Sequence, residues 1–223
     1  MAAIWAFYTN PRNDFWGETV SFLLLVLIPV LVAIVIGVVT GALVSRSRLQ
    51  SFIAINISDL IRATPVLAVL FIFVPIFKIG YLPAAIALTL LGIPPILLNT
   101  YTGLRGIDKA TIEAARGMGM TNWQIMTRVQ APLMMPVVAA GIRTAAVQVT
   151  ATAPLGGLIG AGGYGDYIID GVYSLNTTEI LAGALLVSAL ALLIEIGMSR
   201  LERRLTPAGL RVRAQATAVA AKG

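Results

Sequence analysis

The sequence predicts an all-α polytopic membrane protein with five transmembrane helices, or six if one short helix is counted. Its 223 residues are 58% hydrophobic and only 12% charged, whereas soluble domains carry about 25% charged residues. Apolar runs are separated by short polar segments, as expected for helices that cross a bilayer. The chain has no Cys and no His, which excludes disulfides and thiol catalysis, and we expect no metal site.

The apolar runs divide the chain into a lead-in, a transmembrane domain over 19–200 and a tail. Residues 1–18 carry aromatic side chains such as Trp5 and Trp16, which favour membrane interfaces. The five spans are expected at about residues 19–44, 64–77, 81–101, 133–153 and 179–198. Residues 201–223 form a basic tail.

Glycines, prolines and polar residues predict local features of these spans. Gly37-x-x-x-Gly41 offers a ridge of small residues for close helix contact. Residues 49–64 are mixed in character and are expected to form an interfacial or cytoplasmic helix that leads into the second span. The adjacent Pro94 and Pro95 remove two backbone donors and should break the third span by a kink or unwinding. A glycine-dense segment follows the fourth span, and a short sixth helix is an alternative within residues 154–172.

The distribution of Lys and Arg predicts the orientation of the chain. In a five-span arrangement only Arg12 and Lys78 lie on one side. The others outside the spans lie on the opposite side: Arg46, Arg48, Arg62, Arg105, Lys109, Arg116, Arg128, Arg200, Arg203, Arg204, Arg211, Arg213 and Lys222. We therefore expect the N-terminus outside the cell and the C-terminus in the cytoplasm. The net charge of +6 then reflects topology, and no nucleic-acid partner is expected.

A polar stretch between the third and fourth spans is predicted to form two short cytoplasmic helices. Asp108 is a candidate N-cap for the first, which should end at Gly117 or Gly119. Thr121 and Gln124 have the spacing of a capping box at the start of the second. Pro132 is expected to stop that helix and to turn the chain in a new direction.

The same stretch resembles the EAA loop of the membrane subunits of ABC importers. Glu113-Ala114-Ala115 is followed at the family spacing by Gly119 and then by Val129, Ala131 and Pro132; Val129 and Ala131 replace the usual Ile and Leu. In that family the loop at 108–131 is a coupling helix that docks on a separate ATPase. The resemblance implies that the residues which contact the ATPase are Glu113, Ala114, Ala115, Gly117 and Gly119. The alternative is a chance Glu-Ala-Ala tripeptide in a cytoplasmic loop.

Further segments resemble the permeases for glycine betaine, carnitine and choline. These are Asn99-Thr-Tyr-Thr-Gly103, Gly141-Ile-Arg-Thr-Ala145 and the glycine-dense Leu158–Asp166. The resemblance implies a type I, methionine-importer-like fold in a bacterial inner membrane. It also implies two ATPase subunits that hold ATP and Mg, a second permease chain that is a copy or a paralogue, and an extracytoplasmic solute-binding protein.

The chain itself is not expected to be an enzyme. It lacks the Gly-x-x-x-x-Gly-Lys-Ser/Thr phosphate loop, so no catalytic residue and no cofactor are expected in it. An importer of methionine or polar amino acids is the alternative within the class. A less favoured alternative, outside this class, is an ion-coupled secondary transporter. Ion coupling needs acids inside the spans, and Glu195 is the only acid inside a predicted span.

A few polar residues inside the spans are candidates for gating or for a solute pathway. Arg143 is costly to bury unpaired and is expected to pair with Glu195 near the cytoplasmic interface, with solute contact as the alternative. Asn99, Gln148 and Thr150 either line a pathway or hydrogen-bond between helices, which is the commoner use. In the outer loop Asp166, Asp170 and Glu179 give a negative field that would favour a cationic or zwitterionic solute, unless they only cap helices.

Overall fold

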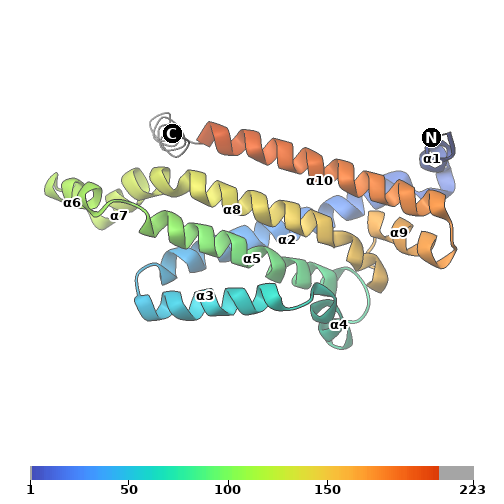
Figure 1. The fold of residues 1–223 in the computed structure, drawn as a ribbon, viewed down its shortest axis with the longest axis horizontal. Helices are drawn as coiled ribbons and strands as arrows, with labels where there is room; N and C mark the ends of the chain where they lie inside the picture. Colours follow the sequence, from blue (N-terminus) through green and yellow to red (C-terminus); the bar gives the residue numbers. More distant parts are fainter. Residues whose placement is uncertain (1, 206–223) are drawn as a thin grey trace, which may run out of the picture.

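The computed structural model describes residues 2–205, in which five long helical runs lie side by side along one axis (Figure 1). The long elements are α2 (Phe15–Val44), α3 (Arg48–Ala63), α5 (Tyr81–Arg105), α8 (Ala131–Thr152) and α10 (Thr177–Leu205). Shorter elements join them: α1 (Ala2–Thr9), η1 (Pro11–Asn13), α4 (Val66–Phe77), α6 (Lys109–Gly117), α7 (Asn122–Ile125), η2 (Met126–Gln130), η3 (Ala153–Ile159) and α9 (Tyr164–Tyr173). Most of the predicted basic tail, from residue 206 onward, lies outside the described residues.

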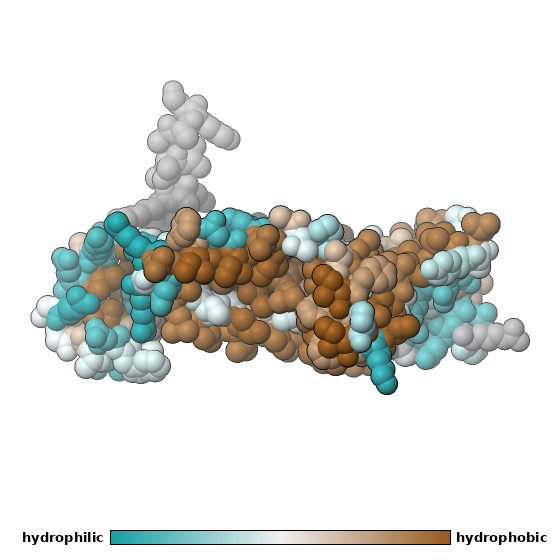
Figure 2. Space-filling view, turned by 90° about the horizontal axis from the view of Figure 1, so that it is seen from below, coloured by the Kyte–Doolittle hydropathy of each residue, from teal (hydrophilic) through white to brown (hydrophobic). Residues whose placement is uncertain are grey.

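The two ends of the bundle are different (Figure 1). At one, here called the loop end, lie α6, α7 and the last described residues of α10. At the other, the α9 end, lie α1, α4 and α9. Figure 2 shows an apolar belt over the middle of the bundle and polar residues gathered toward both ends. This pattern is that of a bundle surrounded by lipid.

Four of the described helical stretches are long and apolar enough to cross a membrane, and the number is five if one bent helix pair counts as a single span. The pair is α3 and α4, which meet at 91°. The prediction of an interfacial helix at 49–64 is wrong in its orientation, because α3 lies lengthwise beside α5 and not across the bundle axis (Figure 1). The polar residues Asn56 and Asp59 had suggested a helix in the plane of the interface. Arg62 is in the last turn of α3, at the end of that helix that lies away from the loop end (Figure 1).

Of the two forms predicted for a break at Pro94 and Pro95, unwinding of the helix is wrong. Helix α5 is continuous through both residues, and both rings are fully buried between neighbouring helices. Close packing of the rings compensates for the two missing backbone donors, so the helix persists. The predicted stop at Pro132 is wrong as well. A π-helical turn, in which the Ala131 N–H donates to the Met126 carbonyl, widens the helix just before Pro132 and lets α7 run on into α8.

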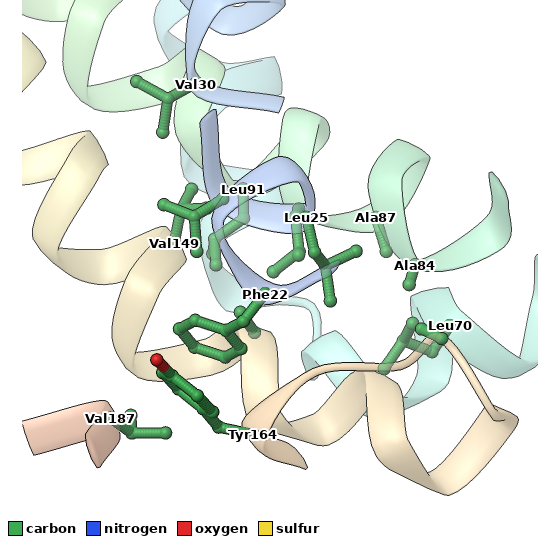
Figure 3. Packing of buried hydrophobic residues seen from close by; sticks show 14 of the residues in the cluster. Phe22, Leu25, Val30, Leu70, Ala84, Ala87, Leu91, Val149, Tyr164 and Val187 are labelled. Atoms are coloured by element: carbon green, nitrogen blue, oxygen red, sulfur yellow. The ribbon is translucent and has the colours of Figure 1, made fainter. Parts of the chain in front are cut away.

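The core lies around α5, which contacts α2 and α8 along its length. The predicted glycine ridge allows this approach. A Cβ at Gly37 would lie 2.8 Å from Ile96 Cβ, and one at Gly41 would lie 2.7 Å from the Leu97 carbonyl oxygen. Toward the α9 end the rings of Phe22 and Tyr164 stack with their centroids 4.8 Å apart (Figure 3). The short helix α9 is thereby attached to α2.

The alternative of a short helix within residues 154–172 is confirmed, in the form of η3 and α9. With ten residues, α9 is about 15 Å long and too short to cross a bilayer. Glycine lets η3 and α9 touch through their backbones. A Cβ at Gly157 would lie 2.6 Å from the Gly165 carbonyl carbon, and one at Gly165 would lie 2.4 Å from the Pro154 carbonyl oxygen.

Gly165→Ala is therefore expected to destabilise the protein, because the methyl group would meet backbone that cannot move aside. Overpacking of this kind costs about 1–3 kcal/mol, and thermal unfolding in lipid-containing detergent should shift down by several degrees. Gly197→Ala is the matched control. A Cβ at Gly197 meets nothing within 4 Å, and alanine favours a helix interior, so this variant should unfold at the wild-type temperature or above. Equal effects from the two variants would contradict the assigned contact.

Candidate functional site

The polar stretch between α5 and α8 folds as two capped helices at the loop end. The Asp108 carboxylate accepts a hydrogen bond from the Ala110 N–H at 3.0 Å, which confirms it as the N-cap of α6. The helix ends at Gly117, and Gly119 has a left-handed φ of 81°. The Met120 N–H then donates to the Ala115 carbonyl at 3.2 Å, as in a glycine-terminated helix. Any residue with a Cβ is strained at position 119.

The second short helix also begins as predicted. Thr121 and Gln124 form a complete capping box, with the Thr121 N–H donating to Gln124 Oε1 at 2.8 Å and the Gln124 N–H to Thr121 Oγ1 at 3.3 Å. The capping groups of α6 and α7 are therefore satisfied within the loop. The pair projects at the extremity of the bundle (Figure 1).

The candidate coupling residues are divided between surface and interior. Glu113, Ala114, Gly117 and Gly119 are exposed, whereas Ala115 is buried. The four exposed residues are free to meet a partner, while Ala115 packs within the chain. Met118 and Trp123 were not among the predicted residues, yet their side chains are 76% and 75% exposed. Such exposed large apolar side chains are available to a partner or to lipid, and their place beside the Glu-Ala-Ala sequence was the available signal.

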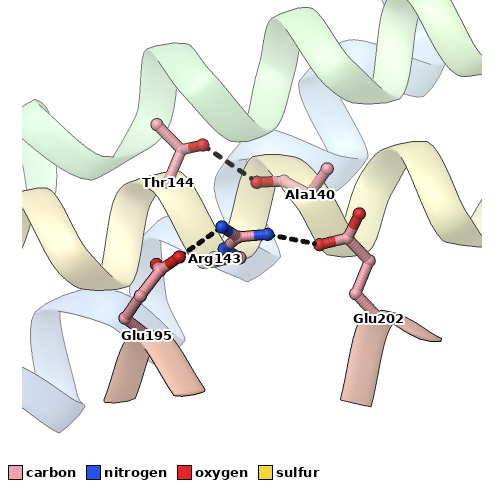
Figure 4. Close-up of polar contacts among 5 residues, drawn as sticks. All are labelled: Ala140, Arg143, Thr144, Glu195 and Glu202. Carbon is pink, nitrogen blue, oxygen red and sulfur yellow. Dashed lines mark hydrogen bonds and ion pairs between the residues drawn. The ribbon is translucent and has the colours of Figure 1, made fainter. Parts of the chain in front are cut away.

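The predicted pair of Arg143 and Glu195 is confirmed, and it has a third member (Figure 4). From α8, Arg143 Nη2 donates to Glu195 on α10, while Nη1 donates to Glu202 Oε2 at 3.1 Å. Seven residues separate the two acids, so they lie on one face of α10. The sequence analysis missed Glu202 because it ended the fifth span near residue 198. The arginine thus joins α8 to α10 through two carboxylates.

A cleft of about 520 Å³ opens beside this ion-pair cluster. Its lining includes Arg143, Glu195 and Gln148 with Thr144 and small apolar residues. Gln148 therefore faces open space. Thr150 is fully buried and donates to the Ala146 carbonyl at 2.7 Å. Asn99 donates to the Pro95 carbonyl at 2.7 Å. In this conformation Asn99 and Thr150 are bonded within their own helices, and Gln148 is the one of the three that borders the cleft.

Carboxylates gather at the α9 end around a cavity of about 270 Å³. Glu18 accepts a hydrogen bond from the Gly163 N–H, which ties α2 to the glycine-dense segment. Burial, together with the charges of Glu18 and Asp170, raises the pKa of Asp166 to about 6. Asp14 and Glu179 border the same cavity. The three acids predicted from the sequence thus lie with Asp14 and Glu18 around one cavity, and the negative field that they would give a solute stays a prediction.

The raised pKa of Asp166 predicts a pH dependence of stability. The folded protein holds this proton up to about pH 6, whereas an unfolded aspartate releases it near pH 4. Stability should therefore fall as the pH rises from about 4 to 6, by about 1 kcal/mol after allowance for solvent screening. Unfolding temperatures measured across this range should show the fall, and Asp166→Asn should remove it. A wild-type pH profile that persists in the Asp166→Asn variant would contradict the assignment.

Comparison with known proteins gives one consistent family. Residues 33–207 match the family described as binding-protein-dependent transport system inner membrane component. The chain is 41% identical over 211 residues to the carnitine transport permease protein OpuCB of Listeria monocytogenes, covering 95% of this chain and 97% of that one. It is 36% identical over 193 residues to the glycine betaine/carnitine/choline transport system permease protein OpuCB of Bacillus subtilis, covering 86% and 89%.

Solved structures show the same fold. A chain of the methionine ABC transporter MetNI, in an inward-facing conformation, superimposes with a TM-score of 0.77 at 25% sequence identity, covering 89% of this chain and 100% of that chain. A second crystal form gives a TM-score of 0.75 at 24% identity and covers 86% and 96%. The predicted all-α, methionine-importer-like fold is confirmed.

Proposed function

Because the chain belongs to the family of binding-protein-dependent transport system inner membrane components, we propose that it carries a small osmoprotectant such as glycine betaine, choline or carnitine through an ATP-driven importer. The observation that carries the solute class is the similarity to permeases of that class, at 35–41% identity over 84% or more of this chain. The chain is a transport subunit, and the chemistry of ATP belongs to another polypeptide.

The proposed assembly has two permease chains, two ATPase subunits that bind ATP and Mg, and an extracytoplasmic solute-binding protein. The exposed face of α6 supports the ATPase contact, because Glu113, Ala114 and Gly117 are available there. The second permease is a copy of this chain or a paralogue. We place the loop end in the cytoplasm and the N-terminus outside, on the basis of the Lys and Arg distribution.

Transport in this assembly couples two movements. Closure of the ATPase dimer around ATP moves the α6–α7 pair, and the π-helical turn at Met126–Gln130 passes that movement into α8 because α7 and α8 are continuous. The Arg143 cluster then keeps α8 and α10 together, so that the two helices tilt as one body. Solute selection rests largely on the binding protein, and Gln148, which borders the cleft, is a candidate for contact with the solute.

The solute class can be tested by uptake. The chain is expressed with its partner subunits in a bacterial host that lacks osmoprotectant uptake, and entry of radiolabelled glycine betaine, choline, carnitine and methionine is measured. We expect at least one of the first three to accumulate, with methionine at background. Uptake of methionine alone would replace the osmoprotectant assignment by the amino-acid importer that the MetNI fold similarity favours.

A further inference from the structure

Three arginines from three separate elements converge on one cavity at the loop end. Arg46 follows the end of α2, Arg105 lies in the last turn of α5, and Arg116 lies in the last turn of α6. All three line a cavity of about 510 Å³, whose lining includes no Asp or Glu. In the part of the chain that the structure describes, ion pairs are formed by Arg143 and not by these three. The cavity thus gathers three arginines without an ion pair to any described residue, one of which, Arg105, also lies over the Tyr101 ring at 5.9 Å from its centroid.

The other lining residues give the cavity a mixed character. Leu104, Ile112, Ile125 and Met126 provide apolar surface, and the exposed Trp123 borders it. Arg46 and Arg105 directly follow the apolar lengths of α2 and α5, which places the cavity at the depth of lipid headgroups. Tryptophan favours this depth, and arginine binds phosphate through paired N–H donors.

We propose that this cavity binds the phosphodiester headgroup of an anionic phospholipid. The arginines hold the phosphate oxygens, Asn122 and Gln130 offer further polar groups, and the apolar residues meet the glycerol and the first acyl carbons. A free phosphate carries the same negative charge but has no apolar part to contact the apolar lining. The lining therefore favours a lipid.

The lipid and the ATPase would not compete for one face of α6. Ile112 and Arg116 are four residues apart and line the cavity, so they share one face of the helix. Glu113, Ala114 and Gly117 follow at other angles around the helix and are exposed. A headgroup bound behind α6 would therefore fix the position of the coupling helix relative to α2 and α5. This inference does not depend on the solute or on ATP.

The test is lipid retention by the full-length chain, purified with whatever subunits accompany it. The protein is exchanged into mixed micelles of phosphatidylglycerol and phosphatidylcholine, and bound lipid is counted by native mass spectrometry. We expect phosphatidylglycerol to be retained preferentially, and the preference to fall about fivefold for each arginine removed in Arg46→Gln and Arg46→Gln/Arg116→Gln. The charge-preserving variant Arg46→Lys/Arg116→Lys should retain much of the preference for phosphatidylglycerol. It shows whether a loss in the glutamine variants comes from lost charge or from misfolding.

Lys109→Gln/Arg128→Gln is the matched control, since both residues are exposed in the same loop and neither lines the cavity. An equal loss in this control would mean a diffuse electrostatic attraction and would overturn the site. Loss of bound phosphatidylglycerol on addition of sodium phosphate would assign the cavity to free phosphate and not to lipid. Unchanged lipid retention in Arg46→Gln/Arg116→Gln, with loss of a co-purified protein, would assign the arginines to a protein contact and also overturn the proposal.

Discussion

Glu113→Lys should abolish the association of the chain with its ATPase and reduce solute uptake at least tenfold, to background. Glu113 is exposed on α6 and makes no ion pair among residues 2–205, so the change should leave the fold intact. A lysine would instead present the wrong charge to a partner cleft that accepts a carboxylate, and like-charge contacts at an interface cost several kcal/mol. Affinity purification through a tag on the tail, followed by identification of co-purifying chains, measures the effect.

Glu179→Lys is the control for this prediction. It makes the same change of charge at the opposite end of the bundle, where Glu179 borders the cavity around Asp166. The ATPase should be recovered with Glu179→Lys and lost with Glu113→Lys. Recovery of the ATPase with both variants would refute the role of α6 as the coupling helix.

Reversal of the central charge in the ion-pair cluster should produce the second large effect. Arg143→Glu would bring three carboxylates together between α8 and α10, whereas the wild-type arginine bonds to both Glu195 and Glu202. The three side chains are 28–36% exposed, so solvent screens part of the repulsion, but three like charges would still push α8 and α10 apart. The thermal unfolding temperature and the rate of solute uptake should both decline.

A graded series distinguishes the cluster from a simple pair. Glu195→Gln should lower stability and uptake only slightly, because Arg143 keeps its ion pair with Glu202. Arg143→Glu/Glu195→Arg should restore only part of the loss, since Glu202 would still face an acid. Inversion of all three charges, in Arg143→Glu/Glu195→Arg/Glu202→Arg, should restore the most. If Arg143→Glu and Glu195→Lys each leave stability and uptake intact, the cluster has no structural or gating role.

Local chemistry made the α6–α7 loop predictable, since Asp108, Gly119 and the Thr121–Gln124 box act over three or four residues. The long spans were predictable from apolar length. The errors arose where packing outweighs local preference. Pro94 and Pro95 remain helical because their rings fill the core, and Pro132 is accommodated by a π-helical turn.

Helix α3 was misassigned for a similar reason. Its polar residues suggested a helix in the plane of the interface, whereas the structure places it lengthwise against α5 (Figure 1). The Arg143–Glu195 pair was predictable because a charge inside a span needs a partner. Glu202 was not, because its role depends on α10 extending past residue 198. The cavity lined by Arg46, Arg105 and Arg116 was not predictable, because its residues are far apart in the sequence and form no short motif.

The central claim is that a separate ATPase drives solute through this chain, and transport in reconstituted vesicles tests it most directly. The complex purified through the tagged chain is placed in liposomes with its solute and binding protein, and accumulation is followed with ATP and Mg supplied on the loop-end side. We predict accumulation that requires ATP, is lost with Glu113→Lys and is indifferent to proton and sodium ionophores. Accumulation that proceeds without ATP and collapses with an ionophore would contradict this account and identify an ion-coupled transporter.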